Sequence, residues 1–341
     1  MRVLRVRKGE SPIKRQGGLG EPGYRSRDSA MEGQTPKRGA RPRRVRPHPP
    51  VLSSASPTGG TPRSAFRRFL AVDEYRAKRE WMRYEGTAQR DLFRMLRERF
   101  LLRHASTVGW AVDLGAGPGR FTPLVGGLGA RKVALDLSVE MLRFPTPPSP
   151  DFQGAAVDKV RGDAARPPLR AGRFSCVAAL GNIFGFAGPD RERLLESAVG
   201  LIGKEGRLLL ELAPGPGERS AYLARLPGTS VARLLRSPVA AILPRVRREP
   251  FRAEPPRKKE DGEFARISAN ELTRHLVLSG FSVEEVLAVA PALGPDAERA
   301  EAVRADPKAW LHLLELEEAL GRDPDRWPRA AAVLVAAHRP P

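Results

Sequence analysis

A run of small and acidic residues near the middle of the chain has residue types and a spacing that could hold a charged ligand. The segment VDLGAGPGRFT, residues 112–122, opens with an apolar run containing Asp113 and continues with glycines at alternate positions, Gly115, Gly117 and Gly119. This pattern predicts a buried strand that opens into a tight turn. A glycine turn that leads into a helix presents backbone N–H groups, which bind a carboxylate or a phosphate well.

A second carboxylate follows at the distance expected of a ribose-binding residue. The segment VALDLSVEML, residues 133–142, indicates a strand from Lys132 to Leu135 that ends on Asp136. In dinucleotide-binding folds, an acidic residue roughly 20 positions beyond the glycine motif binds the ribose hydroxyls. Asp136 stands at that spacing from Gly117, so we expect it to bind a ribose.

The glycine pattern separates two classes of ligand. A dinucleotide fold requires G-x-G-x-x-G/A, whose last small residue lets the helix pack on the strand. Here that position holds Arg120, and Pro118 interrupts the turn, so the dinucleotide pattern fails. The segment instead resembles motif I of the class I S-adenosylmethionine (SAM) dependent methyltransferases. Residues 133–142 resemble the strand-two segment of the same superfamily, especially its broad small-molecule branch.

The resemblance continues in order along the chain. VRGDAARPPL, residues 160–169, resembles the end of the third strand, where the superfamily places an acidic residue against the adenine amine, and Asp163 fits that role. GRFSCVAALGNIFGF, residues 172–186, resembles the fourth strand and the loop that faces the methyl donor. GKEGRLLLELAPG, residues 203–215, supplies a fifth strand. Four motifs in the right order and spacing are much more specific than one.

The resemblance implies S-adenosylmethionine as the cofactor and a role for each matched segment. The glycine turn would hold the methionine carboxylate, Asp113 would orient the methionine amine, and Asp136 would accept both ribose hydroxyls. Leu137, Met141 and Leu180 would enclose the adenine, with core packing as the alternative role. The full expected cofactor set is Asp113, Gly115, Ala116, Gly117, Gly119, Asp136, Leu137, Met141, Asp163, Ala164, Leu180, Gly181, Asn182 and Tyr84.

Two members of this set have a competing structural interpretation. Tyr84 lies on the helix before the first strand, from which the superfamily often sends an aromatic side chain to the methionine end of SAM. Covering the sheet is the alternative role and the commoner one for such an aromatic. Asn182 follows Gly181 in a turn, where asparagine is favoured for conformational reasons alone. Ala164 would read the adenine edge through its amide, beside Asp163.

No catalytic base is assigned. Methyl transfer from a sulfonium is an in-line displacement that neutralises charge, so positioning of the nucleophile and the methyl carbon is the main task. The histidines outside the N-terminal region stand beside none of the motifs; they are His104, His275, His312 and His338. The residues do not specify the acceptor, the methylated atom type or the oligomeric state.

The elements that must position these residues form an α/β fold. A helical pattern runs from Asp73 to His104 with a break at Gly86, after which Thr87 can cap a second helix. FPTPPSP, residues 144–150, should cut short the helix after the second strand. Further helices are expected at residues 190–202, 268–280 and 307–320, and further strands at 281–289 and 330–337. We therefore expect a seven-stranded, mostly parallel sheet with helices on both faces and an antiparallel last strand.

Composition narrows the setting. The 341 residues are 41% hydrophobic, enough for one large domain with an appendage, and no apolar run reaches membrane length. The charged N-terminus does not resemble a secretory signal, so a cytoplasmic protein is the default. Cys176 is the single cysteine, which excludes an intramolecular disulfide and a multi-cysteine metal site, and no metal is expected.

The net charge of +20 is concentrated in two segments. Residues 1–65 hold 15 Lys+Arg and 4 Asp+Glu, and their Gly and Pro content predicts a disordered basic tail. The tail could bind RNA, could be solvated without a partner, or could precede a true start at Met31 or Met82. Residues 66–341 would form the methyltransferase domain. Within it, residues 214–266 hold 12 Lys+Arg and 6 Asp+Glu and would form a substrate-recognition or lid insertion.

Three functions remain open at this stage. The leading hypothesis is an enzyme that methylates a small molecule, and the second is an RNA or protein methyltransferase guided by the basic segments. The third is a SAM-binding or nucleic-acid-binding module without turnover. The segment LGNIF, residues 180–184, lacks the N/DPPY-type motif, which disfavours methylation of amino groups on DNA bases.

Overall fold

The computed structural model describes the central and C-terminal parts of the chain. The described residues are 74–105, 108–127, 129–145, 157–213, 223, 226–248, 267–293 and 297–341. The chain separates into two units, Met1–Pro57 and Thr58–Pro341, and every described residue belongs to the second. The expected basic tail therefore lies outside the described residues, as do residues 214–222, 224–225 and 249–266 of the expected insertion.

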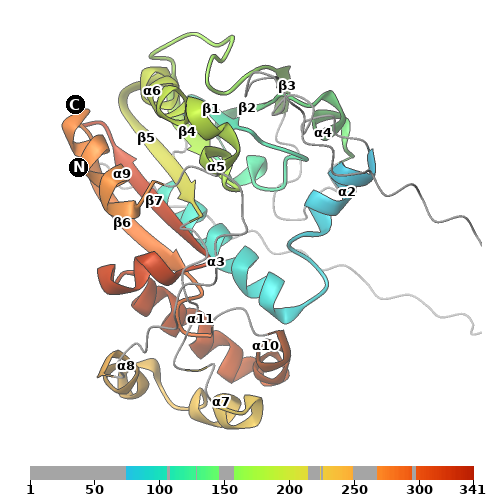
Figure 1. Ribbon diagram of the computed structural model, residues 1–341, viewed down its shortest axis with the longest axis vertical. Coiled ribbons are helices and arrows are strands. Elements are labelled where there is room, and N and C mark those ends of the chain that lie inside the picture. Colours follow the sequence, from blue (N-terminus) through green and yellow to red (C-terminus); the bar gives the residue numbers. More distant parts are fainter. Residues whose placement is uncertain are drawn as a thin grey trace, which may run out of the picture. The chain divides into compact units, whose positions relative to one another are not determined.

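Within the described ranges, seven strands form one sheet (Figure 1). They are β1 (Trp110–Leu114), β2 (Arg131–Asp136), β3 (Val157–Arg161), β4 (Phe174–Ala179), β5 (Ile202–Leu212), β6 (Ser282–Val289) and β7 (Ala332–His338). The strand order is β3-β2-β1-β4-β5-β7-β6. The first five strands are parallel, whereas β7 is antiparallel to both β5 and β6. The predicted fold class is confirmed.

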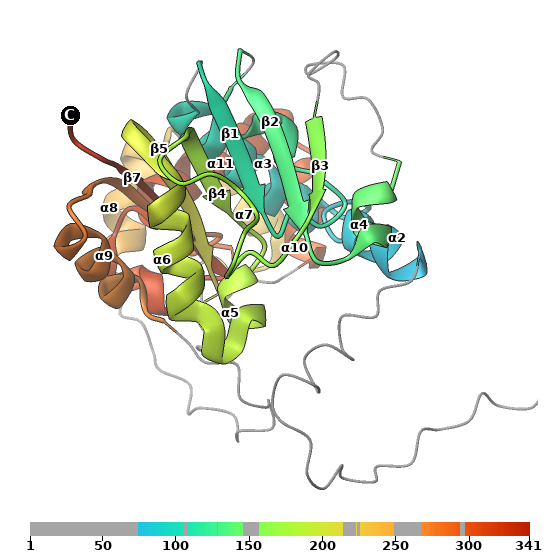
Figure 2. The same cartoon turned by 90° about the horizontal axis from the view of Figure 1, so that it is seen from above.

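Helices cover both faces of the sheet (Figure 2). They are α2 (Glu74–Met82), α3 (Ala88–His104), α4 (Val139–Arg143), α5 (Ile183–Ala187), α6 (Arg191–Leu201), α7 (Gly228–Leu234), α8 (Val239–Arg248), α9 (Ala269–Leu278), α10 (Ala297–Arg304) and α11 (Pro307–Gly321). One buried cluster joins α3, α10 and α11 to the sheet, and α7 and α8 share it. The other joins α5, α6 and α9 to the opposite face.

The central strands are buried on both faces, which explains their continuous apolar sequences. In β4, Cys176 and Ala178 join the cluster of α3, while Val177 and Ala179 join the cluster of α6. This alternation is the period of two expected of a strand. The thiol of Cys176 is fully buried inside this strand.

Several predicted helix ends are confirmed in atomic detail. The Thr87 side chain accepts a hydrogen bond from the Arg90 amide, so α3 begins at Ala88. Ser268 and Glu271 form both bonds of a capping box at the start of α9. The helix α4 has only five residues and ends just before the proline-rich segment, as proline chemistry requires. The helices α5 and α10 were not expected from the sequence.

The turn after β1 does not lead into an α-helix, so that expectation was wrong. Among the described residues between β1 and β2, the helical conformation is limited to the three-residue 3₁₀ helix Thr122–Leu124. Gly126 then adopts a φ of +78°, which ends the helical conformation. Close packing excludes a side chain at Gly126, because a Cβ atom there would lie 2.3 Å from the Cβ of Ala111 in β1.

The described helices also bear on membrane association. None of them is long and apolar enough to cross a membrane.

Candidate cofactor pocket

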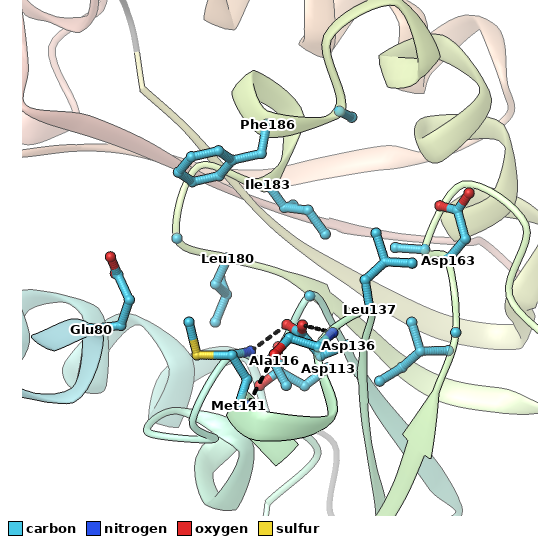
Figure 3. Close-up of a pocket in the computed structure, with 18 of the residues that line it drawn as sticks. Glu80, Asp113, Ala116, Asp136, Leu137, Met141, Asp163, Leu180, Ile183 and Phe186 are labelled. Carbon is cyan, nitrogen blue, oxygen red and sulfur yellow. Dashed lines mark hydrogen bonds between the residues drawn. The ribbon is translucent and has the colours of Figure 1, made fainter. Parts of the chain in front are cut away.

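A cavity of about 1200 Å³ opens at the carboxyl ends of the parallel strands (Figure 3). Its wall includes Asp113 near the end of β1, Asp136 at the end of β2 and Leu180 just after β4. The chain order reverses across this region, because β1 pairs with β2 on one side and with β4 on the other. Ligands of open α/β sheets bind at such a switch point.

Most of the residues expected to bind the cofactor come together on this cavity. Those that line it are Tyr84, Asp113, Gly115, Ala116, Gly117, Asp136, Leu137, Met141, Asp163, Ala164, Leu180 and Gly181. They derive from the β1, β2 and β4 ends, the helix α4, the segment after β3 and the connection between α2 and α3. Their assignment as SAM ligands stays a prediction.

Two expected residues do not line the cavity. The Gly119 amide donates to the Ala116 carbonyl at 3.0 Å and so closes the turn. Asn182 is the N-cap residue of α5 with a φ of 65°, and its side-chain amide lies against Gly185. Their roles in cofactor binding likewise stay predictions.

The Asp136 carboxylate is held by two backbone amides. Gly117 N donates to Oδ2 at 2.8 Å and Ser138 N donates to Oδ1 at 2.9 Å. Burial raises the pKa of Asp136, and these hydrogen bonds oppose that rise. Each carboxylate oxygen can accept more than one hydrogen bond, so the fixed group can still receive two donors from a ligand.

Asp113 is more deeply buried than Asp136. The residue is 3% exposed, and its carboxyl accepts a hydrogen bond from the Thr122 hydroxyl at 2.6 Å. Burial raises the pKa of Asp113 to about 7, and the nearby Asp136 charge adds to the rise while the Thr122 bond opposes it. A cationic group in the cavity would favour the ionised form of this carboxyl.

The amides of the glycine turn are not free, which corrects the sequence-based expectation. Gly115 N and Ala116 N both donate to the Leu135 carbonyl, at 2.7 and 3.0 Å. The parallel register explains this, because Leu114 pairs with Leu135 and the turn crosses the end of β2. With Gly117 N bound to Asp136, the turn uses its own donors to fix the cavity wall.

The glycines themselves are required by the backbone. Gly115 has a φ of +67°, and a Cβ atom there would lie 2.2 Å from the Cδ1 atom of Ile183. Gly117 has a φ of +56°, but no atom lies within 4 Å of the place where its Cβ would be. The wall is therefore open at Gly117, where a ligand can approach the backbone closely.

The expected adenine side has an exposed apolar wall and a polar loop. Leu137 is 38% exposed although it is apolar, whereas Met141, on α4, is buried. The Asp163 carboxylate accepts the Ala165 amide at 2.9 Å, which fixes the loop after β3. This arrangement leaves an apolar surface next to a carboxylate.

Tyr84 reaches the cavity from the connection between α2 and α3. Its ring packs edge-on against Phe121 with centroids 5.2 Å apart, and the Arg97 guanidinium lies 5.3 Å from the ring centroid. Burial raises the pKa of Tyr84. Tyr84 therefore packs against the rest of the fold as well as lining the cavity.

The sequence did not identify several other lining residues. The helix α2 contributes Arg76 and Glu80, and the turn after it contributes Arg83. The segment after β1 contributes Pro118, Arg120 and Phe121, and α5 contributes Ile183, Phe186 and Ala187. The mostly apolar segment IFGFA, residues 183–187, could have indicated the short helix α5. No pattern in the sequence indicated which side of α2 faces the cavity.

Comparison with known families identifies the class. Residues 112–210 match the model of a family described as "Methyltransferase domain". The match runs from β1 to β5 and includes the turn, Asp136 and the loop after β4. Together with the strand order, it shows that this part of the chain is a methyltransferase domain with the class I, Rossmann-like fold.

No curated protein sequence matches the chain. Among solved structures, a SAM-dependent methyltransferase from Mesorhizobium loti is 22% identical, with 74% of this chain and 99% of that chain covered and a TM-score of 0.42. A SAM-dependent methyltransferase from Thermotoga maritima, a possible histamine N-methyltransferase, is 18% identical over 81% and 98%, with a TM-score of 0.40. Geranyl diphosphate C-methyltransferase from Streptomyces coelicolor is 16% identical over 72% and 79%, with a TM-score of 0.39.

Proposed function

We propose that the protein binds SAM in this cavity and transfers its methyl group to a small-molecule acceptor. The observation that carries the proposal is the Asp136 carboxylate, fixed by the Gly117 and Ser138 amides at the edge of the cavity. A carboxylate fixed in this way suits a pair of vicinal hydroxyls, as on a ribose.

The cavity also fits the remainder of the ligand. Gly117 and Gly181 both have positive φ and open space where a Cβ atom would stand, so a ligand can lie against the backbone at two places. The volume of about 1200 Å³ exceeds the roughly 300–1000 Å³ of a pocket for one drug-sized ligand. Cofactor and acceptor can therefore share it.

The residues of the chain would divide the cofactor among them. Asp136 would accept the ribose hydroxyls, Asp113 would face the methionine ammonium, and Asp163 would accept from the adenine amine. Leu137, Met141 and Leu180 would enclose the adenine ring. When bound, SAM supplies an electrophilic methyl group on a sulfonium, and the protein's task is to position the acceptor atom in line with it.

The acceptor would lie between α2 and α5. In Figure 3, Phe186 and Ile183 lie on one side of the cavity and Glu80 on the other, with Leu180 between them. The apolar side chains of Phe186, Ile183 and Leu180 would exclude water from the reacting atoms. A small molecule with an apolar part suits this space better than a folded macromolecule.

A second candidate is an RNA or protein acceptor, supported by the charge of α8. Arg245, Arg247 and Arg248 are exposed on this helix. Residues 226–248 contain no residue of the cavity wall, and they contact α10 and α11 instead. For example, the His312 ring nitrogen Nδ1 lies 2.7 Å from the Leu235 carbonyl oxygen. The role of residues 226–248 as a substrate-recognition or lid element stays a proposal.

The product of the reaction tests the proposed function. The purified protein would be incubated with methyl-deuterated SAM and, in separate reactions, with metabolite and RNA pools, and mass spectrometry would detect labelled products. An Asp136→Ala variant serves as the control. Label in a small molecule supports the proposal, and label in RNA supports the second candidate. SAM binding without any labelled product would indicate a binding module.

A further inference from the structure

The methionine carboxylate of the cofactor needs a partner that the glycine turn does not offer. Gly115 N and Ala116 N donate to Leu135, Gly117 N donates to Asp136, and Gly119 N donates to Ala116. The remaining turn residue is Pro118, which has no N–H. A carboxylate bound at the turn would have to break one of these bonds.

A buried cation stands directly beyond the turn. Arg120 lines the cavity, and its side chain is 12% exposed. Its Nη2 atom donates to the Trp81 carbonyl at 2.7 Å and to Glu85 Oε1 at 2.5 Å. The guanidinium lies 4.0 Å from the centroid of the Trp81 ring, which fixes its plane. Arg120 is thus held rigidly at the wall of the cavity.

One donor of this guanidinium has no partner. Nε of Arg120 is buried and makes no hydrogen bond within the described part of the chain. A buried donor without a partner is costly, and the cost disappears if a ligand supplies an acceptor. A carboxylate is the acceptor that best matches the planar donors of arginine.

Another cavity arginine near the same end is a weaker candidate. Arg83 is half exposed, at 52% of its side chain, and its nearest carboxylate is Glu80 at 3.4 Å. Water screens an exposed charge of this kind, so Arg83 would discriminate poorly between ligands. Arg120 combines burial, a fixed orientation and an unused donor.

We propose that Arg120 binds the methionine carboxylate of SAM. This inference rests on the proposed function, because it concerns the same cavity and the same cofactor. It replaces the backbone amides of the glycine turn with a side chain three residues beyond Gly117. Glu85, which pairs with Arg120, acts as a positioning residue for the guanidinium.

Two ligands separate this role from a structural one. S-adenosylhomocysteine carries the amino-acid carboxylate, and 5′-methylthioadenosine lacks it while keeping the adenosine and the sulfur. By calorimetry, Arg120→Gln should weaken S-adenosylhomocysteine binding by about tenfold or more and 5′-methylthioadenosine binding by less than about threefold. Arg120→Lys should lose less, because it keeps the charge but not the planar fork. Arg79→Gln is the matched control, because Arg79 is exposed on α2 and lies outside the cavity wall, and it should change neither affinity by more than about threefold.

The outcomes distinguish the two proposals. An equal loss for both ligands, or no loss for S-adenosylhomocysteine, would overturn the Arg120 assignment and leave SAM binding intact. A wild-type protein that binds neither SAM nor S-adenosylhomocysteine would overturn the proposed function itself. Thermal melting of each variant checks the fold. If Arg120→Gln does not fold, the same comparison is made with Arg120→Lys, which must still lose affinity for S-adenosylhomocysteine selectively.

Discussion

The carboxylate of Glu211 joins the side chain of Arg97 to the backbone of Gly181. Arg97 Nη2 donates to Oε1 at 2.6 Å and Nε donates to Oε2 at 3.0 Å, while Gly181 N donates to Oε2 at 3.1 Å. Both side chains are almost fully buried. Burial would raise the pKa of Glu211, but the charge and hydrogen bonds of Arg97, together with the Gly181 amide, keep the pKa below its ordinary value. The pair connects α3 and β5 to the loop that forms one wall of the cavity.

Removing one partner of this pair should destabilise the protein strongly. Arg97→Met leaves the Glu211 carboxylate buried without its cation, and breaking a buried ion pair typically costs about 3–5 kcal/mol of unfolding free energy. The double variant Arg97→Met with Glu211→Gln should recover much of that loss, because the charge is removed as well. Urea denaturation measures both effects. A single variant as stable as the wild type would contradict the role of the pair.

Cofactor binding should release a proton from Asp113. In the free protein its pKa is about 7, above its ordinary value of 3.8, because the carboxyl is buried. A bound cation lowers the pKa, so near pH 6.5 binding should release a fraction of a proton, and above about pH 8 almost none. Calorimetry in buffers with different ionisation enthalpies measures this release.

The same shift fixes the sign of a stability effect. The folded protein holds the Asp113 proton more tightly than the unfolded chain does. Ionisation of this carboxyl therefore destabilises the folded state relative to the unfolded chain. Its contribution to stability should fall as the pH rises from about 4 to about 7. Asp113→Asn should remove both this fall and the proton release. An unchanged proton release in that variant would show that another group titrates.

The arginines of α8 test the second candidate function. If the acceptor is RNA or another polyanion, the triple change of Arg245, Arg247 and Arg248 to Gln should raise the Michaelis constant for the acceptor, and the effect should shrink as salt increases. SAM affinity should not change, because none of the three lines the cavity. Unchanged kinetics at low and high salt, on an acceptor that the wild type methylates, would exclude an electrostatic role for this helix.

The sequence predicted the elements whose determinants are local. Thr87, the Ser268 capping box and the prolines after α4 each act within a few residues, so their effects could be read directly. The seven-stranded, mostly parallel sheet followed from the motif order and the resemblance to a known superfamily. The short length of the turn after β1 depended on the close approach of Gly126 to Ala111, which no local pattern reveals.

The parts of the site that the sequence did not predict depend on contacts between distant residues. The Leu135 carbonyl accepts hydrogen bonds from the Gly115 and Ala116 amides because β1 and β2 pair in one particular register. Arg97 and Glu211 are 114 positions apart, and neither belongs to a recognised motif. In the sequence, Arg120 only marked a departure from the dinucleotide-binding pattern, whereas in the fold it lies on the wall of the cavity.

The most direct test of the account is calorimetric titration of the protein with SAM, S-adenosylhomocysteine and NAD. The wild type should bind the first two saturably and should not respond to NAD. Asp136→Ala should weaken SAM binding by about 1.5 kcal/mol or more, because it removes a charged acceptor. Asp158→Asn, on the exposed part of β3 and outside the cavity wall, should bind like the wild type. Wild-type affinity for SAM in a folded Asp136→Ala protein, or no SAM binding at all, would contradict the assignment of this cavity.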